Sequence, residues 1–288
     1  MIKFEGLPGS DFAKLGNYQE ITDFLMDTKC DVHELGLSSN DDMVYGLSVG
    51  DTSKPMILVD GTMHGGHEWT CTHWVKAFIE MIADPPNNYW KPFIEKMRAE
   101  FCFFAIPCLN TYGYMNNSYL NANGVNLNRN FPLGWDRYRT EEPGHSQYKG
   151  PEPFSEPESK MIKELVDKYR VVGYVNCHTW GGYKGHVFET SSTVKEFRTL
   201  LDDISDSIQI TFPDFEKVMR YRNGPSTPWV TEWMGDESSK LGKDILCVIY
   251  EVGSEESNHN KSKLGVTSLL IYSYYIYKWF RERKLVLS

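Results

Sequence analysis

The chain contains two short apolar runs that each end in metal-binding side chains, and this pattern limits its possible folds more than any other feature. Met56 to Val59 leads into His64-Gly65-Gly66-His67-Glu68-Trp69, and Val171 to Val175 leads into Asn176-Cys177-His178. Buried strands would deliver the polar residues that follow them to one edge of a sheet. Two imidazoles and one carboxylate, with a fourth position left for water, form the ligand set of a catalytic zinc. The sequence therefore predicts a zinc hydrolase.

The candidate ligands are His64, Glu68 and His178, with His67 as the alternative to His64. A loop that carries one histidine and the glutamate, joined by a histidine from a distant strand, differs from the paired Cys-x-x-Cys spacing of closed structural zinc. His67-Glu68 also resembles the start of a His-Glu-x-x-His helix, which places histidines at i and i+4 on one helix face. Position 71 is Cys71, so that motif is absent.

Strand and helix patterns alternate along most of the chain. Strands are expected over Met43 to Val49, Met56 to Val59, Phe101 to Ile106, Gly173 to Cys177 and Ile245 to Tyr250, and helices over Tyr18 to Met26, Glu68 to Asp84, Pro157 to Tyr169, Val194 to Ile208 and Lys261 to Arg283. Such alternation indicates an α/β fold with a mixed, mostly parallel twisted sheet flanked by helices on both faces. We expect a single catalytic domain over residues 1–288, with residues 1–40 as a helical N-terminal lead-in packed on it.

Two segments between these elements carry local signals. Residues 110–150 form a long polar stretch rich in Asn and Gly, and a loop of this length in a compact domain is typical of a functional segment. Ser155, followed three positions later by Glu158, predicts a capping box at the start of the helix from Pro157.

Composition excludes several classes of partner. The formal net charge is −9 and no basic run occurs, which argues against nucleic-acid binding. The first residues lack the apolar stretch of a signal peptide, so we expect a cytoplasmic protein. Leu264 to Phe280 is too short and too polar for a membrane span, and no membrane partner is expected. The scattered cysteines read as buried free thiols in a reducing compartment.

Several motifs, in one order, resemble the carboxypeptidase A-like family of zinc metallopeptidases. They are the His-Gly-…-Glu-Trp loop, Asn110-Thr111-Tyr112-Gly113-Tyr114, Gly124-Val125-Asn126-Leu127-Asn128-Arg129-Asn130-Phe131, the run from Tyr148 to Glu158, His178, and Tyr250-Glu251-Val252-Gly253. The resemblance covers roughly residues 40 to 285. It implies one Zn²⁺ per chain and the fold of the zinc carboxypeptidases.

The resemblance also implies roles for individual residues. Glu251 would take a proton from the attacking water and pass it to the leaving amine, as general base and then general acid. Arg129, with Asn128 beside it, would bind the terminal carboxylate of the substrate, for which a guanidinium offers two parallel donors. Tyr221 would be the tyrosine that closes over the substrate.

This chain departs from the family pattern at three places. The first ligand of the family stands three residues before the glutamate, where this chain has Gly65. Either the loop has an extra residue and His64 binds, which we favour, or His67 does. Asn126 stands where the family has an aspartate that supports the first histidine, and we expect its amide to accept the imidazole proton.

The third departure is a missing arginine. Relatives carry an arginine before the Asn-Arg pair that stabilises the negative charge developing on the substrate, but residues 113–128 contain neither Arg nor Lys. The metal, Tyr119, Arg137 or Arg139 would have to do that work.

The leading hypothesis is a zinc metallocarboxypeptidase that hydrolyses the C-terminal amide bond of a peptide or small amide substrate with a free carboxylate. Cell-wall-type peptides are one class of substrate that we expect for such an enzyme. The alternatives are an N-acyl amino acid deacylase of the desuccinylase and aspartoacylase type, and an inactive binding module that keeps the fold.

Overall fold

The structure is a computed structural model, and it describes residues 12–86, 89–139, 141–180, 185–190, 195–215, 217–221, 229–240 and 245–287. For residues 67, 180, 195–196, 217–221, 237–240 and 283–287 it describes the backbone alone. The described strands form one sheet in the order β1-β2-β4-β3-β5-β8-β6-β7. They are β1 (Asp31–Leu37), β2 (Met43–Val49), β3 (Met56–Gly61), β4 (Cys102–Ile106), β5 (Val171–Trp180), β6 (His186–Thr190), β7 (Lys217–Tyr221) and β8 (Leu246–Gly253).

The helices connect these strands and cover the sheet. The α-helices are α1 (Tyr18–Met26), α2 (Thr70–Ala83), α3 (Lys91–Glu100), α4 (Thr111–Asn116), α5 (Pro157–Lys168), α6 (Lys195–Thr211), α7 (Val230–Lys240) and α8 (Asn258–Leu287). Short 3₁₀ helices are η1 (Gly66–Trp69), η2 (Leu127–Arg129) and η3 (Trp135–Arg137). Each expected strand and helix is present, within a few residues at its ends.

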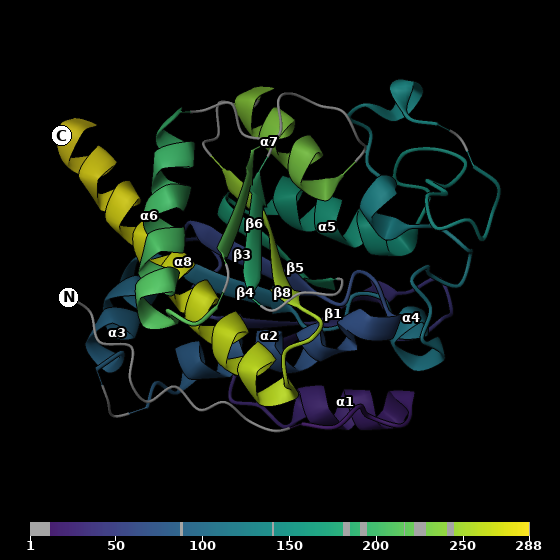
Figure 1. The fold of residues 1–288 in the computed structure, drawn as a ribbon, viewed down its shortest axis with the longest axis horizontal. Helices are drawn as coiled ribbons and strands as arrows, with labels where there is room; N and C mark the ends of the chain where they lie inside the picture. The colour runs from purple at the N-terminus through teal and green to yellow at the C-terminus, as the bar shows by residue number, and fades with distance from the viewer. Residues whose placement is uncertain are drawn as a thin grey trace.

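The sheet is mixed and its centre is parallel, as predicted. β4, β3, β5 and β8 run in one direction, whereas β2 pairs antiparallel with β4, and β6 with β8. Figure 1 shows the sheet between α5 and α7 on one side and α2 and α8 on the other. Ile57 and Val175 belong to the core beneath α2 and α8, and Leu58 and Tyr174 to the core beneath α5 and α7. Burial on both faces explains why these strands are almost continuously apolar.

The order of the central strands places a topological switch point between β3 and β5. From β3 the chain continues to β4 on one side of the β3–β5 pair. From β5 it continues to β6 and β8 on the other side. In open α/β sheets such a switch point leaves a crevice at the carboxyl ends of the strands, where ligands bind. The loop that carries His64 and Glu68 begins at this edge, directly after β3.

Two local predictions were wrong. Within residues 1–40, α1 is helical as expected, but Asp31–Leu37 forms edge strand β1, paired antiparallel with β2. Most of its side chains face solvent, so its sequence lacks an apolar run. The capping box is also absent, because Glu156 is the N-cap of α5 and makes no side-chain cap bond.

Two buried glutamates near the start of α5, Glu156 and Glu158, instead anchor the long loop. Glu158 is fully buried and accepts hydrogen bonds from the backbone and hydroxyl of Ser39, at 2.9 and 2.7 Å. Glu156 accepts hydrogen bonds from Asn121 and Asn123, at 2.7 and 2.8 Å. Neutral donors therefore satisfy two buried carboxylates and tie residues 117–157 to the β1–β2 turn. Residues 110–150 contain α4, η2 and η3 and are otherwise irregular.

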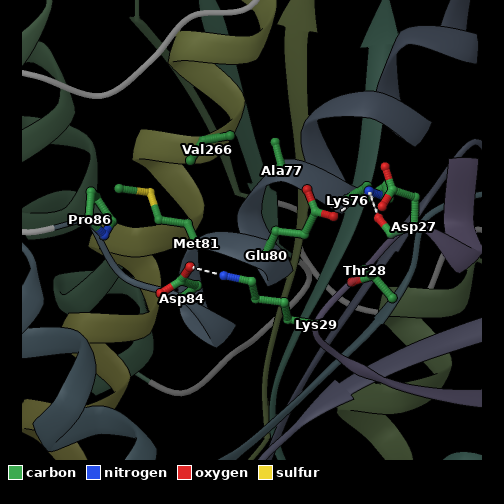
Figure 2. A pocket seen from close by; sticks show the side chains of 10 residues that line it. All are labelled: Asp27, Thr28, Lys29, Lys76, Ala77, Glu80, Met81, Asp84, Pro86 and Val266. Atoms are coloured by element: carbon green, nitrogen blue, oxygen red, sulfur yellow. Dashed lines mark hydrogen bonds and ion pairs between the residues drawn. The ribbon is translucent and has the colours of Figure 1, made fainter.

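A pocket of about 580 Å³ lies on the α2 side of the molecule. Residues of the α1–β1 connection, of α2 and its end, and Val266 of α8 line it (Figure 2). The ion pair Lys29–Asp84 lies at its edge, and Lys76 donates to the carbonyl of Asp27 at 2.9 Å. None of the predicted site residues lines this pocket.

A buried histidine makes the fold sensitive to acid. The His73 ring stacks on Phe12, with centroids 4.4 Å apart, and meets the edge of Trp69 at 5.5 Å. Burial, with Lys76 adding to it, lowers the pKa of His73 to about 4. Since an imidazole in the unfolded chain titrates near 6.5, the unfolded state binds more protons between these two values, and stability is lost as the pH falls through this range.

We therefore expect His73→Phe to flatten the pH dependence of unfolding. Between pH 7 and pH 4 the wild type should lose about 3 kcal/mol more unfolding free energy than the variant, because the phenyl ring has no proton to gain. Urea unfolding at a series of pH values measures the difference. Parallel curves for the two proteins would contradict the prediction.

Candidate metal centre

Strained backbone after β3 delivers the first two candidate ligands. Thr62 and Gly66 have φ values of 53° and 65°, in the left-handed region. A Cβ atom on Gly65 would lie 1.9 Å from the carbonyl carbon of Gly113, so only glycine fits there. The two glycines thus accommodate the additional loop residue, and η1 follows directly with Glu68.

Strand geometry delivers the third candidate ligand. His178 lies near the end of β5, in register with Glu251 of β8. Successive side chains of a strand alternate between the faces of a sheet, so Asn176 and His178 share one face. Residues in register on neighbouring strands also share a face, and Glu251 therefore lies beside His178.

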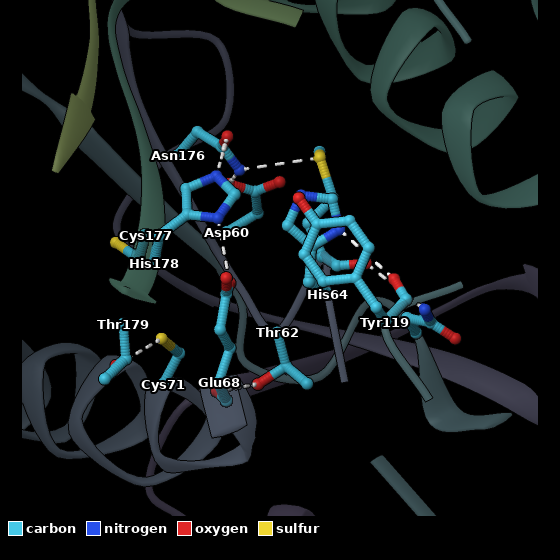
Figure 3. Close-up of polar contacts among 12 residues, drawn as sticks. Asp60, Thr62, His64, Glu68, Cys71, Tyr119, Asn176, Cys177, His178 and Thr179 are labelled. Atoms are coloured by element: carbon cyan, nitrogen blue, oxygen red, sulfur yellow. Dashed lines mark hydrogen bonds and ion pairs between the residues drawn. The ribbon is translucent and has the colours of Figure 1, made fainter. Parts of the chain in front are cut away.

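The structure brings His64, Glu68 and His178 together. All three are buried, and one ligand atom from each lies within 4.8 Å of the others. His178 Nδ1 is 2.8 Å from Glu68 Oε2, and the rings of His64 and His178 have centroids 5.1 Å apart (Figure 3). Two imidazoles and a carboxylate from three separate positions fit a zinc ion with one open coordination position. The cluster can therefore hold the predicted metal.

The pKa values of the two imidazoles are shifted in opposite directions. Burial, together with the charges of His178 and Arg129, holds the pKa of His64 well below its ordinary value. Burial also opposes protonation of His178, but the carboxylates of Glu68 and Glu251 outweigh it and raise the pKa of that imidazole. His64 is thus neutral at neutral pH, which is the form that binds a metal.

Tyr119 packs directly against the first histidine. Its ring stacks on that of His64 with centroids 3.9 Å apart and an interplanar angle of 18°, and its carbonyl oxygen accepts from His64 Nδ1 at 3.3 Å. The side chain of Asn126 instead donates to the carbonyl of Ser146 at 2.7 Å. The expected support of His64 by Asn126 was therefore wrong, because the Tyr119 backbone supplies the acceptor.

The three residues proposed to replace the missing arginine have different surroundings. Arg137 and Arg139 are exposed, and Arg139 pairs with Glu141 at 2.7 Å. Tyr119 alone among them contacts a residue of the cluster. Tyr119 is 37% exposed, and its partial burial, with the carboxylates of Glu68 and Glu251 adding to it, raises the pKa of its hydroxyl. The hydroxyl is therefore protonated and can donate a hydrogen bond.

Arg129 is a buried cation held by neutral groups. Its Nε donates to Tyr138 and Gln147, both at 3.0 Å, and its Nη1 to the carbonyl of Asn128 at 2.9 Å. Its guanidinium also lies over the Trp229 ring, 5.1 Å from the centroid. The side chain is 9% exposed, and no carboxylate of the described residues pairs with it. Its charge lowers the pKa of His64, so the two groups interact electrostatically.

Of the remaining predicted residues, one links two elements of the fold, and the side chains of the others lie outside the described part of the structure. Asn128 accepts the backbone N–H of Val230 at 3.2 Å and so links η2 to α7. The backbone of Tyr221 ends β7 and that of His67 lies in η1, but their side chains lie outside the described part of the structure. The prediction for Tyr221 therefore stays a prediction.

Sequence reasoning missed three polar residues behind His178. Asn176 Oδ1 accepts the N–H of His178 Nε2, and Asn176 Nδ2 donates to Asp60 Oδ1 at 2.9 Å (Figure 3). Tyr174 donates to Asp60 Oδ2 at 3.1 Å. Burial raises the pKa of Asp60 to about 6, although these hydrogen bonds oppose the change. Two signals could have found them: an aspartate that ends an apolar strand, and an asparagine two positions before His178, on the same strand face.

Comparisons with known proteins agree with this geometry. The family model described as zinc carboxypeptidase matches residues 24–279. Carboxypeptidase B of Astacus astacus is 24% identical over 59% of this chain and 63% of its own length, and mast cell carboxypeptidase A of Rattus norvegicus is 27% identical over 51% and 40%. The chain thus spans about 40 to 63% of the length of these curated relatives.

Solved structures show the same fold. A metallo-carboxypeptidase from Burkholderia cenocepacia has a TM-score of 0.69 and 15% identity, over 90% of this chain and 68% of that chain. Bovine thrombin-activatable fibrinolysis inhibitor, in complex with tick carboxypeptidase inhibitor, has a TM-score of 0.69 and 17% identity, over 92% of this chain and 95% of that chain. Within the described residues, no helix has the length and apolar character needed to cross a membrane. With the family model matched from residue 24 to residue 279, the chain belongs to the zinc carboxypeptidase family.

Proposed function

We propose that the protein is a zinc-dependent metallocarboxypeptidase that removes the C-terminal residue from a peptide with a free carboxylate. His64, Glu68 and His178 hold one Zn²⁺ in this proposal, and their shared burial and spacing support it. The proposal places the protein in the cytoplasm and includes cell-wall-type peptides among its substrates.

The observation that carries the proposal is the state of Arg129. A buried charge is costly unless it is paired and hydrogen-bonded, yet Arg129 is 9% exposed and its described partners are neutral oxygens and aromatic rings. A buried guanidinium that neutral groups hold in place suits a planar carboxylate, which accepts two parallel hydrogen bonds. A substrate with a terminal carboxylate supplies the missing negative charge.

The chemistry then divides among the residues of the site. A zinc ion bound at the cluster supplies a water of lowered pKa and polarises the scissile carbonyl. Glu251 accepts a proton from the attacking water and returns it to the leaving amine nitrogen, which restores the carboxylate. Arg129 and Asn128 orient the terminal carboxylate, and Tyr221 closes over the bound substrate.

The metal assignment predicts one zinc per chain. His178→Ala should weaken zinc binding by more than the roughly 10- to 100-fold that loss of an outer hydrogen-bond partner costs, because it removes a ligand. Competition with a chelator measures the affinity. His259→Ala, which removes an exposed histidine, is the control and should bind zinc as the wild type does. Wild-type affinity in His178→Ala would exclude this metal site.

The acid–base role predicts a specific loss in Glu251→Gln. An amide cannot accept the proton of the attacking water, so kcat should fall by at least about 10²-fold while the zinc content stays at one per chain. Glu255→Gln, an exposed carboxylate four residues further, is the matched control. Metal analysis and peptide turnover test both variants, and full turnover in Glu251→Gln would assign the base elsewhere.

The role of Arg129 predicts a preference for free acids. Amidation of the peptide C-terminus removes the charge that the guanidinium binds, and loss of such a partner costs roughly 1.5–3 kcal/mol, or about 10- to 150-fold in kcat/KM. Arg129→Ala should slow cleavage of the free acid by a similar factor and leave the amidated peptide almost unchanged. Arg137→Ala, an exposed arginine, serves as the control.

The same substrate panel separates the alternatives. Equal cleavage of free and amidated peptides would contradict an exopeptidase. Turnover confined to N-acyl amino acids would favour the deacylase, and zinc binding without turnover on any substrate would favour a binding module.

A further inference from the structure

A line of buried polar groups runs from His178 away from the metal cluster. Tyr174, Asn176 and His178 alternate along β5 and so share one face, and Asp60 of β3 lies in register with Asn176. Asp60, Asn176 and Tyr174 are all fully buried. The described structure pairs no lysine or arginine with Asp60, so hydrogen bonds from neutral groups stabilise its carboxylate. Figure 3 shows Asp60, Asn176 and His178 in sequence, with Glu68 on the far side of the imidazole.

The donors and acceptors in this line can point in only one direction. An ionised carboxylate only accepts hydrogen bonds, so the Asn176 amide must turn its NH₂ group toward Asp60, at 2.9 Å. Its carbonyl oxygen then faces His178 Nε2, and that nitrogen must carry the proton because an amide oxygen has none to donate. A neutral imidazole protonated at Nε2 has its lone pair on Nδ1, the nitrogen 2.8 Å from Glu68.

We propose that Asp60 is a positioning residue that acts through Asn176 to hold His178 in the tautomer whose Nδ1 binds the metal. The inference rests on the proposed zinc site at His64, Glu68 and His178. Outer hydrogen-bond partners of metal-bound histidines orient the ring and fix its tautomer in this way. Tyr174 occupies the second oxygen of Asp60, at 3.1 Å, and so leaves the first oxygen for Asn176.

The contact between Asp60 and Asn176 also joins the two strands that position the candidate ligands. Asp60 ends the strand that leads to His64 and Glu68, and Asn176 lies two residues before His178. The hydrogen bond between Asp60 and Asn176 crosses from β3 to β5, directly behind the cluster. The same contact that orients His178 therefore also fixes its strand against the strand that leads to the other two ligands.

Asp60→Asn tests the direction of the hydrogen bonds. With Tyr174 donating to it as to the wild-type carboxylate, the new amide accepts through its oxygen, so its NH₂ group meets the NH₂ group of Asn176. Asn176 then has to turn over, present its own NH₂ group to His178 Nε2, and leave the proton on Nδ1. Zinc affinity, measured by chelator competition, should fall by about 10- to 100-fold. Unchanged affinity in a folded Asp60→Asn protein would overturn the proposal.

The double exchange Asp60→Asn with Asn176→Asp restores the direction. The new carboxylate at position 176 accepts from His178 and from the new amide at position 60, while Tyr174 still donates to that amide. Zinc affinity should return to within a few-fold of the wild type, which we expect because each donor again meets an acceptor. This variant is decisive even where the single variant does not fold, since a double variant as weak as the predicted single one would overturn the proposal.

Tyr174→Phe separates positioning from packing. It removes a donor to Asp60 and should lower the unfolding temperature, but the contact between Asp60 and Asn176 remains. Zinc affinity that stays near the wild-type value supports the proposal, whereas a loss equal to that of Asp60→Asn would show a merely structural role. Because all these measurements are made without substrate, a protein that binds zinc as predicted but cleaves no peptide would contradict the proposed function and leave this inference intact.

Discussion

The parallel pairing of β3 with β5 is the constraint on which the site depends. The strand order reverses between these two strands, so their carboxyl ends form a topological switch point, while both faces of the sheet are covered. The edge receives the loop with His64 and Glu68 from one strand and His178 from the other. β8 continues the same register and adds Glu251 beside His178. A slip of one residue in either pairing would turn these side chains to the opposite face, so register determines the chemistry as directly as residue type does.

Hydrogen bonding of buried polar groups is the second constraint, and it explains the composition of the loops. Residues 117–157 hold few regular elements, yet Asn121, Asn123 and Asn130 satisfy carboxylates and backbone groups inside the protein. The Asn130 side chain binds five residues in this way: Lys149, Glu152, Ser155, Glu156 and Ser159. In the sequence these asparagines look like ordinary polar loop residues. In the structure their hydrogen bonds hold the segment that carries Arg129 in place. A buried guanidinium stays in place because its surroundings are fixed by groups of this kind.

Much of the fold was predictable because its signals are local. Continuous apolar runs such as Ile245 to Tyr250 identify strands buried on both faces, and the residues after them identify the edge where ligands meet. Edge strand β1 was missed because its side chains face solvent and carry no apolar run. The predicted capping box does not form because tertiary partners, Ser39 above all, bind the Glu158 side chain that a local rule assigned to the helix end. Local rules fail where a distant group offers a better partner.

The candidate site, like the fold, was predictable where the signal is local and not where it depends on tertiary contacts. Glu68 and His178 could be named from the sequence by their chemistry and their place at or after the ends of apolar runs, and His64 was favoured over His67. The support of His64 could not, because a backbone carbonyl, that of Tyr119, replaces the side chain that family resemblance implied, and any residue carries a carbonyl. The support of His178 left two traces in the sequence: Asp60 near the end of an apolar strand, and Asn176 two positions before His178. A charged residue in a buried apolar strand needs hydrogen-bond partners inside the protein. Asp60 has such partners in Tyr174 and in Asn176, which lies in register with it. Asn176 in turn contacts His178 of the metal cluster.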